Sequence, residues 1–268
     1  MGRIVTLTTD FGLADEFVGV LKGVILTLAP SALLVDLSHE ITAHDIRQAA
    51  FMLAASWGYF PVGSIHLAVV DPGVGSARSL VLVETADHLF LAPDNGLLSL
   101  VLAMALPARA WRVENAVLFH GPISATFHGR DILAPVAARL VAGMDPGLVG
   151  PPLAVRELVL LPDLEPLFDA QSRIITGRVE QVDRFGNLVT NIRTSLLRDV
   201  FGEDFKGLEI DCGRGKVRGL SDTFSAVAVG EAAAVSGGRG CLELVVNQGR
   251  AADYFLVGQG GLVLVRGN

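Results

Sequence analysis

The spacing of hydrophobic and polar positions alternates between two kinds of segment over roughly the first half of the chain. Apolar runs of strand length occupy residues 3–9, 33–37 and 65–70, and apolar positions recur every three or four residues over 15–28 and 45–54. The order is therefore strand, helix, strand, helix, strand. This order predicts a parallel sheet whose helical crossovers are right-handed.

The same pattern continues less regularly up to a connecting segment. Further strands are predicted at 79–85, 89–92 and 110–113, and further helices at 97–105 and 132–141. Residues 151–168 are rich in proline and acidic residues and show no clear period. We interpret this stretch as the connector between two domains.

Short β-type runs separated by glycine-rich turns follow the connector, and no convincing helix is predicted there. The runs lie at 174–182, 188–192, 208–211, 226–229, 232–236, 242–246 and 262–265. The expected fold class is α/β. An amino-terminal domain (residues 1–168) would contain a mostly parallel sheet, and a smaller all-β, barrel-like domain (residues 169–268) would follow it.

Composition narrows the class of protein. The chain has 268 residues, 51% of them hydrophobic, and a net charge of -7, so it lacks the basic surface typical of nucleic-acid binding. Two cysteines, Cys212 and Cys241, are too few for a disulfide framework. With neither a signal peptide nor a membrane-spanning run evident, we expect a cytoplasmic enzyme that binds neither nucleic acid nor membrane.

The strand predicted at 65–70 leads directly into a candidate site. Asp71 follows it, a proline and two glycines turn the chain, and Arg78 comes seven residues after the acid. Carboxyl ends of parallel strands form the edge at which open α/β folds bind ligands. The alternative is an ordinary Asp-Pro-Gly turn without a function.

Acids and histidines are concentrated at the predicted strand ends and in the adjoining turns. These residues are Asp10, Asp15, Asp36, His39, His44, Asp45, Asp71, Asp94, His128 and Asp131. A convergent set of this kind can bind a divalent metal. However, no dense ligand motif is present, and Arg78 is a poor neighbour for a metal but a good one for a carboxylate. We therefore expect no metal.

Asp71, Arg78 and His128 form a plausible set for activating water. The arginine would keep the carboxylate ionised, and the histidine could accept or relay a proton. The structural alternative is an ion pair with a capping histidine. In the second domain, residues 182–187 carry an acid, an aromatic ring and an amide. That stretch is either a tight turn or a ligand-binding loop.

These motifs together resemble one family. Residues 8–12, 36–41, 69–75 with Arg78, 93–96, 126–131 and 182–192 occur in the order and spacing of the S-adenosyl-L-methionine hydroxide adenosyltransferases, also called SAM hydrolases. Fluorinating and chlorinating enzymes that use the same substrate are related to this family. The resemblance covers nearly the whole chain. It implies an α/β domain, a β-barrel-like domain and a homotrimer with active sites at subunit interfaces.

The resemblance also implies a reaction and a set of site residues. Water and S-adenosyl-L-methionine (SAM) would give adenosine and L-methionine, without a cofactor. Asp71, Arg78 and His128 match the water-activating triad. The substrate-binding positions implied are Asp10 for the ribose hydroxyls, Asp15 and Asp183 near the methionine amino group, Phe185 and Asn187 in an adenine-binding loop from a neighbouring subunit, and Asn247 near the methionine carboxylate.

Two alternatives to a hydrolase remain open at this point. Halogenating relatives carry tyrosine at the position of Asp71 and lack the arginine and histidine partners, and a carboxylate would repel halide. A binding or sensor protein that holds SAM or adenosine without turnover is the other alternative. The complete set of Asp71, Arg78 and His128 favours the hydrolase, because a protein that only binds has no need of all three.

Overall fold

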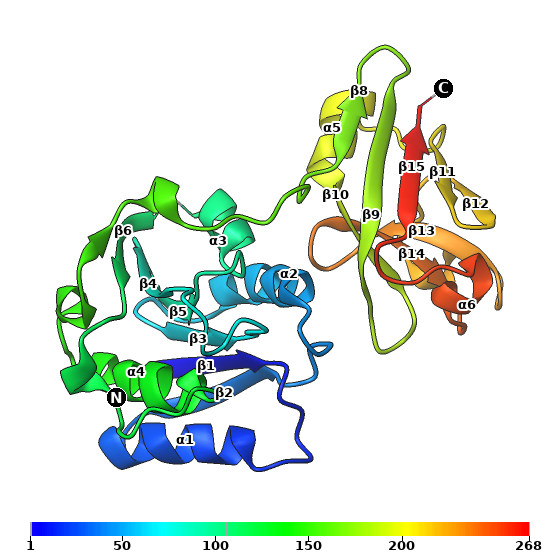
Figure 1. The fold of residues 1–268 in the computed structure, drawn as a ribbon. Coiled ribbons are helices and arrows are strands. Elements are labelled where there is room, and N and C mark those ends of the chain that lie inside the picture. Colours follow the sequence, from blue (N-terminus) through cyan, green and yellow to red (C-terminus); the bar gives the residue numbers. More distant parts are fainter. Residues whose placement is uncertain (1, 106, 268) are drawn as a thin grey trace. The chain divides into compact units, whose positions relative to one another are not determined.

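The computed structural model describes residues 2–105 and 107–267, drawn as a ribbon in Figure 1. The chain divides into two compact units, Met1–Pro162 and Asp163–Asn268. This division comes slightly earlier than the boundary expected after residue 168. The reason is that strand β8 (Leu167–Asp169) pairs with β9 (Ile174–Val182), so the end of the connector belongs to the second unit.

The sheet of the first unit, over the described residues, has the strand order β2-β1-β3-β5-β4-β6-β7. Its strands are β1 (Ile4–Thr9), β2 (Leu33–Ser38), β3 (Ile65–Val69), β4 (Leu80–Thr85), β5 (Leu89–Pro93), β6 (Pro107–Arg112) and β7 (Pro152–Leu153). β2, β1, β3 and β5 run parallel, whereas β4, β6 and β7 are added antiparallel. The predicted α/β class is confirmed, with a mixed sheet.

Helices cover both faces of this sheet. They are α1 (Phe17–Leu28), α2 (Ile46–Ser56), α3 (Ser99–Met104) and α4 (Ala134–Val141), the last preceded by a π-helical turn, Gly129–Leu133. One core cluster joins α1 and α4 to the sheet through Leu21 and Ala137, and another joins α2 and α3 through Leu53 and Val101. Successive strand residues belong to alternate clusters, as expected for a sheet buried on both sides.

The parallel register decides which residues meet. Thr9 of β1 is the in-register partner of Val69 of β3, so the residues just beyond these strands, Asp10 and Asp71, lie at one edge of the sheet. Among the helices of the described residues, none is long and apolar enough to cross a membrane.

The second unit is an antiparallel, barrel-like sheet in the order β12-β11-β15-β9-β10-β14-β13, with β8 paired to β9. Beyond β8 and β9, its strands are β10 (Leu188–Arg193), β11 (Glu209–Cys212), β12 (Gly215–Arg218), β13 (Ala232–Ser236), β14 (Cys241–Val246) and β15 (Leu262–Arg266). The outer strands β12 and β13 approach each other, and Ser221, just after β12, forms a β-bridge with Val235 of β13. The sheet is therefore nearly closed, as the barrel-like prediction expects.

Three sequence predictions for this unit were wrong or incomplete. The strand predicted at 226–229 is absent: a 3₁₀ turn, Phe224–Ala226, is followed by a loop in which the Val227 carbonyl accepts a hydrogen bond from the Asn247 side chain. Strand β12 was not predicted. Helices α5 (Thr194–Phe201) and α6 (Ala251–Phe255) were also missed, because they are too short to show a period.

Candidate active site

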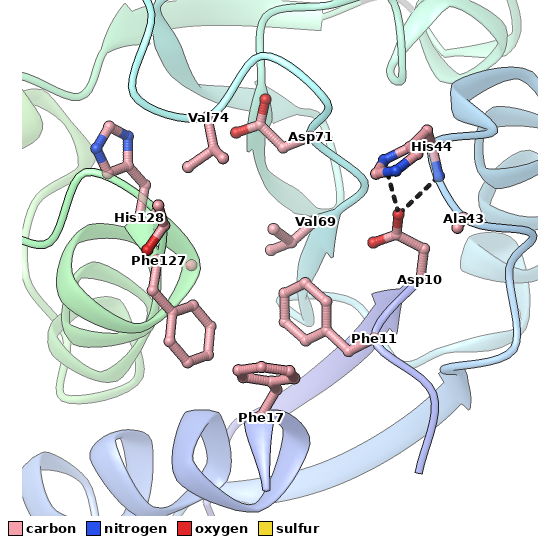
Figure 2. A pocket seen from close by; sticks show the side chains of 12 residues that line it. Asp10, Phe11, Phe17, Ala43, His44, Val69, Asp71, Val74, Phe127 and His128 are labelled. Atoms are coloured by element: carbon pink, nitrogen blue, oxygen red, sulfur yellow. Dashed lines mark hydrogen bonds and ion pairs between the residues drawn. The ribbon is translucent and has the colours of Figure 1, made fainter. Parts of the chain in front are cut away.

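A cavity of about 270 Å³ lies at the edge of the first unit where β1 and β3 end. Figure 2 shows the side chains that line it, with Asp10 following β1 and Asp71 following β3. Phe11, Phe17 and Phe127 form one wall, with ring centroids 5.4–6.1 Å apart in edge-on contacts. The sequence pattern indicated the acids but did not indicate this aromatic wall.

Asp71 is paired with Arg78 across the turn that follows β3. Arg78 Nε lies 2.8 Å from each carboxylate oxygen, and Nη2 also donates to Oδ2. Only 6% of the Asp71 side chain and 11% of the Arg78 side chain are exposed. A charge-assisted pair that is this shielded from solvent holds the carboxylate in one orientation.

Gly75 allows this turn to contact the loop that precedes His128. Its φ is +79°, a conformation that favours glycine. A Cβ atom at this position would lie 2.4 Å from the Ala125 carbonyl oxygen. The second glycine of the motif therefore permits a close backbone approach.

His128 completes the cluster through Arg78. Nη2 of Arg78 lies 3.0 Å from Nδ1 of His128. A guanidinium only donates, so Nδ1 accepts and the neutral ring carries its proton on Nε2. Burial lowers the pKa of His128, and the charge of Arg78 lowers it further, against the opposing effect of Asp71 and Asp131. The ring is therefore held neutral at pH 7.

The predicted motif at residues 93–96 supports the backbone at Asp71. The Asn95 side chain donates to the carbonyl oxygen of Val70 over 2.9 Å, and its own oxygen accepts from the Leu97 N–H. Asp94 accepts from the Val159 N–H, and burial raises the pKa of the Asp94 carboxyl. These contacts position the end of β3.

The motif at 126–131 holds the loop on the other side of the cavity. The Asp131 carboxylate accepts from Nε and Nη2 of Arg130, at 2.6 and 2.9 Å, and from the Ser124 N–H. Burial alone would raise the pKa of Asp131, but these hydrogen bonds keep it below its ordinary value. The guanidinium of Arg130 also lies 5.0 Å from the centre of the Phe127 ring, which lines the cavity.

Asp10 lies next to His44, across the cavity from His128, as Figure 2 shows. Its Oδ2 accepts from the His44 N–H over 2.9 Å, and the His44 ring nitrogen Nδ1 is 4.0 Å away. His44 takes a φ of +68° and its side chain is largely exposed. By contrast, Asp15 is exposed and does not line the cavity.

The other acids noted in the sequence have separate partners. Asp45 caps α2 by accepting from the Gln48 N–H, and Asp36 pairs with Lys22 and His39. Within residues 2–105 and 107–267, no group of three or more histidine, cysteine or acidic side chains is arranged to hold a metal ion.

A second cavity, of about 580 Å³, lies in the second unit. Its lining includes Asp183, Phe185, Asn187, Glu243 and Arg250. Asp183 Oδ1 accepts from the Phe185 and Asn187 N–H groups, and Oδ2 accepts from the Asn187 side chain, so the loop presents Phe185 with 74% of its surface exposed. Burial raises the pKa of Glu243, although the charge of Arg239 opposes this.

Asn247 is the predicted site residue that does not line this cavity. Its side chain donates to the Val227 carbonyl over 2.8 Å, and it holds the loop that replaces the predicted strand. Glu243 and Arg250 were missed by the sequence analysis. Glu243 lies in a buried strand and Arg250 immediately before α6, and neither position has a local signal.

Fold and site together define a two-domain enzyme with a half-buried carboxylate, guanidinium and imidazole cluster at a sheet edge. The chain belongs to the SAM hydroxide adenosyltransferase family: the model of the family's N-terminal domain matches residues 5–150, and that of its C-terminal domain matches residues 177–264.

Named relatives agree with this membership. The chain is 40% identical to the (R)-S-adenosyl-L-methionine hydrolase of Salinispora tropica, over 96% of this chain and 95% of the relative. It is 38% identical to the protein of the same name from Thermus thermophilus, over 94% of each chain. A fluorinase from an Actinoplanes species is more distant, at 28% identity over 72% of this chain and 73% of the relative.

A solved structure has the same fold over the whole chain. It is described as an uncharacterized conserved protein from Thermotoga maritima, with a TM-score of 0.91 and 35% identity, and the match covers 98% of this chain and 100% of that one.

Proposed function

We propose that this protein hydrolyses SAM to adenosine and L-methionine by attack of water on the ribose C5′ atom. The observation that carries the proposal is the shielded cluster of Asp71, Arg78 and His128 beside the cavity at the end of β3. The family membership and the hydrolase names of the two relatives at 38–40% identity support it.

The chemistry needs positioning more than a strong base. A bond forms between the water oxygen and C5′ while the C5′–S bond breaks, and its electron pair leaves with sulfur as neutral methionine. The sulfonium charge disappears as the water releases a proton. Orientation of one water molecule in line with the breaking bond can contribute several kcal/mol, of the order of 7–11 in favourable cases.

The cluster suits this task. Arg78 fixes the Asp71 carboxylate, which can hold a water molecule by accepting one of its hydrogens and can take the proton released on attack. As observed, His128 cannot take a proton on Nδ1 without losing its hydrogen bond from Arg78. We therefore assign His128 the role of orienting water through its Nε2–H, in place of the proton-accepting role expected from the sequence.

The remaining residues are assigned to the substrate. Asp10 would hold the ribose hydroxyls, and Asp15 and Asp183 would lie near the methionine amino group. Phe185 and Asn187 would bind adenine, and Asn247 would lie near the methionine carboxylate. Phe185 supports this assignment, because it presents an exposed ring beside a cavity. No cofactor is needed for the reaction.

We further propose a homotrimer in which each site is completed by the second unit of a neighbouring subunit. Exposed apolar side chains on α1, in the turn before it and on the edge strand β2 support an assembly. We name these residues the α1–β2 surface; they are Leu13, Phe17, Val20, Leu28, Leu33 and Val35. Exposed apolar side chains beside an edge strand are typical of a protein interface. A cytoplasmic location is consistent with two cysteines that are both free and buried.

The test is incubation of metal-stripped protein with SAM in water labelled with heavy oxygen, followed by mass spectrometry. Adenosine labelled at its 5′ oxygen, together with free methionine, is the expected result. Unchanged SAM bound to the protein would favour a sensor. A halogenated adenosine formed on addition of chloride would show that the role of Asp71 is misjudged.

A further inference from the structure

A chain of polar contacts runs from the surface of the first unit to the turn that carries Asp10. Lys22 on α1 donates to Asp36 on β2 over 2.6 Å. Asp36 Oδ1 lies 3.1 Å from Nε2 of His39, an electrostatic contact whose N–H is not aligned for a full hydrogen bond. His39 Nδ1 in turn lies 2.8 Å from the Thr9 hydroxyl at the end of β1.

His39 contacts both sides of the turn at residues 10–12. Its ring reaches Thr9, immediately before Asp10, and its carbonyl oxygen accepts from the Gly12 N–H over 2.8 Å. The Thr9 hydroxyl also accepts from the Phe11 N–H over 3.3 Å. The backbone on each side of Asp10 is therefore tied, directly or through Thr9, to one buried histidine.

The direction of these hydrogen bonds follows from the acceptors. A carboxylate only accepts, so the ring nitrogen that faces Asp36 is the one that carries the proton. With the proton on Nε2, Nδ1 accepts from the Thr9 hydroxyl, whose lone pairs remain free for the Phe11 N–H. Burial alone would raise the pKa of Asp36, but the contacts with Lys22 and His39 keep it below its ordinary value.

The order hydroxyl, imidazole, carboxylate resembles a nucleophilic triad, but the geometry excludes that role. Thr9 is fully buried and His39 is 3% exposed. A nucleophile must reach its substrate, and the Thr9 hydroxyl contacts the main chain of Phe11 instead of the cavity. The contacts therefore serve the shape of the turn.

We propose that His39, acting through Thr9, is a positioning residue that fixes the Asp10 carboxylate for the ribose hydroxyls of the substrate. This inference rests on the proposed function, in which Asp10 binds those hydroxyls. It assigns a role to the motif at residues 36–41, which the water-activating cluster leaves unexplained. A carboxylate that must accept two adjacent hydroxyls depends on its placement to well within 1 Å.

The sequence offers a matched control on the same strand. Thr6 is also fully buried on β1, and its hydroxyl lies 2.8 Å from Nδ1 of another buried histidine, His66. Thr6 is remote from the turn at residues 10–12. Thr6→Val therefore removes the same kind of hydrogen bond as Thr9→Val without touching the proposed site.

The experiment compares the affinities of adenosine and 2′,3′-dideoxyadenosine by calorimetry. The preference for adenosine reports recognition of the two hydroxyls, independently of turnover. Asp10→Ala is expected to abolish the preference, and Thr9→Val to lower it about tenfold. Thr9→Ser and Thr6→Val are expected to keep it. His39→Leu should lower the preference for adenosine as much as Thr9→Val does. His39→Asn should retain most of the preference, because its amide oxygen can replace Nδ1 as the hydrogen-bond acceptor.

The experiment distinguishes failure of the inference about His39 from failure of the proposed function. If Asp10→Ala loses the preference and Thr9→Val keeps it, the positioning role of His39 is overturned and the proposed function stands. If Thr6→Val lowers the preference for adenosine as much as Thr9→Val does, the cause is a general loosening of β1, and the inference is also overturned. If Asp10→Ala keeps the preference, the ribose assignment and the inference are both wrong. Thermal unfolding of each variant confirms that it is folded.

Discussion

Arg78 donates to Nδ1 of His128 over 3.0 Å while its other N–H groups bind Asp71. One guanidinium thus sets both the orientation of the carboxylate and the protonation state of the imidazole. Burial lowers the pKa of His128, and the charge of Arg78 acts in the same direction.

Arg78→Gln should therefore raise the pKa of His128. In the variant the ring loses a neighbouring positive charge and faces the unpaired carboxylate of Asp71, which favours the protonated form. NMR titration of labelled histidine measures the change, and the wild-type pKa should lie below 6.5. Arg109→Gln removes the charge of a surface pair with Glu84 and should leave the titration of His128 as it is. Equal pKa values in wild type and Arg78→Gln would contradict the role assigned to Arg78.

The same geometry predicts the pH dependence of activity. Protonation of Nδ1 removes the acceptor for Arg78, so kcat/KM should fall on the acid side through the lowered pKa of His128, at a pH below 6.5. Rate profiles with saturating and limiting SAM measure this. An acid limb centred above pH 6.5 would be incompatible with it.

Asp71→Asn should lower kcat by about 100-fold or more and leave adenosine affinity within a few-fold of wild type. An amide presents N–H groups where the carboxylate accepts from Arg78, so it can neither hold the water in the same way nor take its proton. Steady-state kinetics and calorimetry measure the two quantities. Glu84→Gln, which alters a carboxylate paired with Arg109, is the control. A parallel loss of binding and turnover would instead indicate a structural role.

Gly75→Ala should destabilise the first unit more than Gly143→Ala. Both glycines have a positive φ, at +79° and +92°, so each substitution costs about 1–2 kcal/mol of conformational energy. Only at Gly75 would the new Cβ meet backbone, the Ala125 carbonyl, whereas at Gly143 nothing lies within 4 Å. Thermal unfolding compares the variants, and similar losses for both would show that the contact with Ala125 is unimportant.

His66 should make stability depend on pH. Burial, together with the charge of His88, lowers its pKa to about 3. The unfolded chain therefore binds a proton at this residue that the folded chain does not. The contribution of His66 to the free energy of unfolding should fall as pH drops through 6.5, by up to ~1.4 kcal/mol per pH unit. Denaturant unfolding between pH 7 and 5 measures the slope. His66→Gln should have a shallower slope, and identical slopes would refute the assignment.

Leu33→Asp should dissociate the proposed trimer and abolish hydrolysis, since each site would then lack its second unit. Leu33 is 53% exposed on the edge strand β2, and a charge there opposes burial against a neighbour. Sedimentation velocity measures the assembly. Val117→Asp places the same charge at a residue that is 84% exposed and lies outside the α1–β2 surface, and it should remain trimeric. A monomeric wild type, or a trimeric Leu33→Asp, would contradict the proposal.

The sequence was most informative where local pattern and tertiary structure require the same thing. The apolar run at 65–70 is β3 because it is buried on both faces, and the turn after it needs Gly75 for its backbone. The motifs at 93–96 and 126–131 were also visible. The purpose of these motifs was not visible in the sequence, because it depends on two hydrogen bonds. The Asn95 side chain donates to the Val70 carbonyl, and the Asp131 carboxylate accepts from the Ser124 N–H.

Elements that are short, or whose structure depends on contacts with distant segments, were not predicted correctly from the sequence. Residues 226–229 have an apolar composition suited to a strand, but Asn247 binds the backbone there, so no ladder forms. Helix α5 is only eight residues long, and its stability comes from Leu197 packing into the core of the barrel.

By itself, the sequence determined the alternation of elements, the division into an α/β and an all-β part, and the residue types available at each strand end. Hydrophobic period and turn chemistry are local, so they can be read along the chain. Only the tertiary structure decided that Arg78 binds both Asp71 and His128 and that His39 contacts both sides of the turn at Asp10. It also decided that Asp15 does not line the cavity beside Asp71 and that the Asn247 side chain binds the Val227 carbonyl. Those outcomes depend on register and on side-chain distances between segments far apart in the chain, and no local pattern contains them.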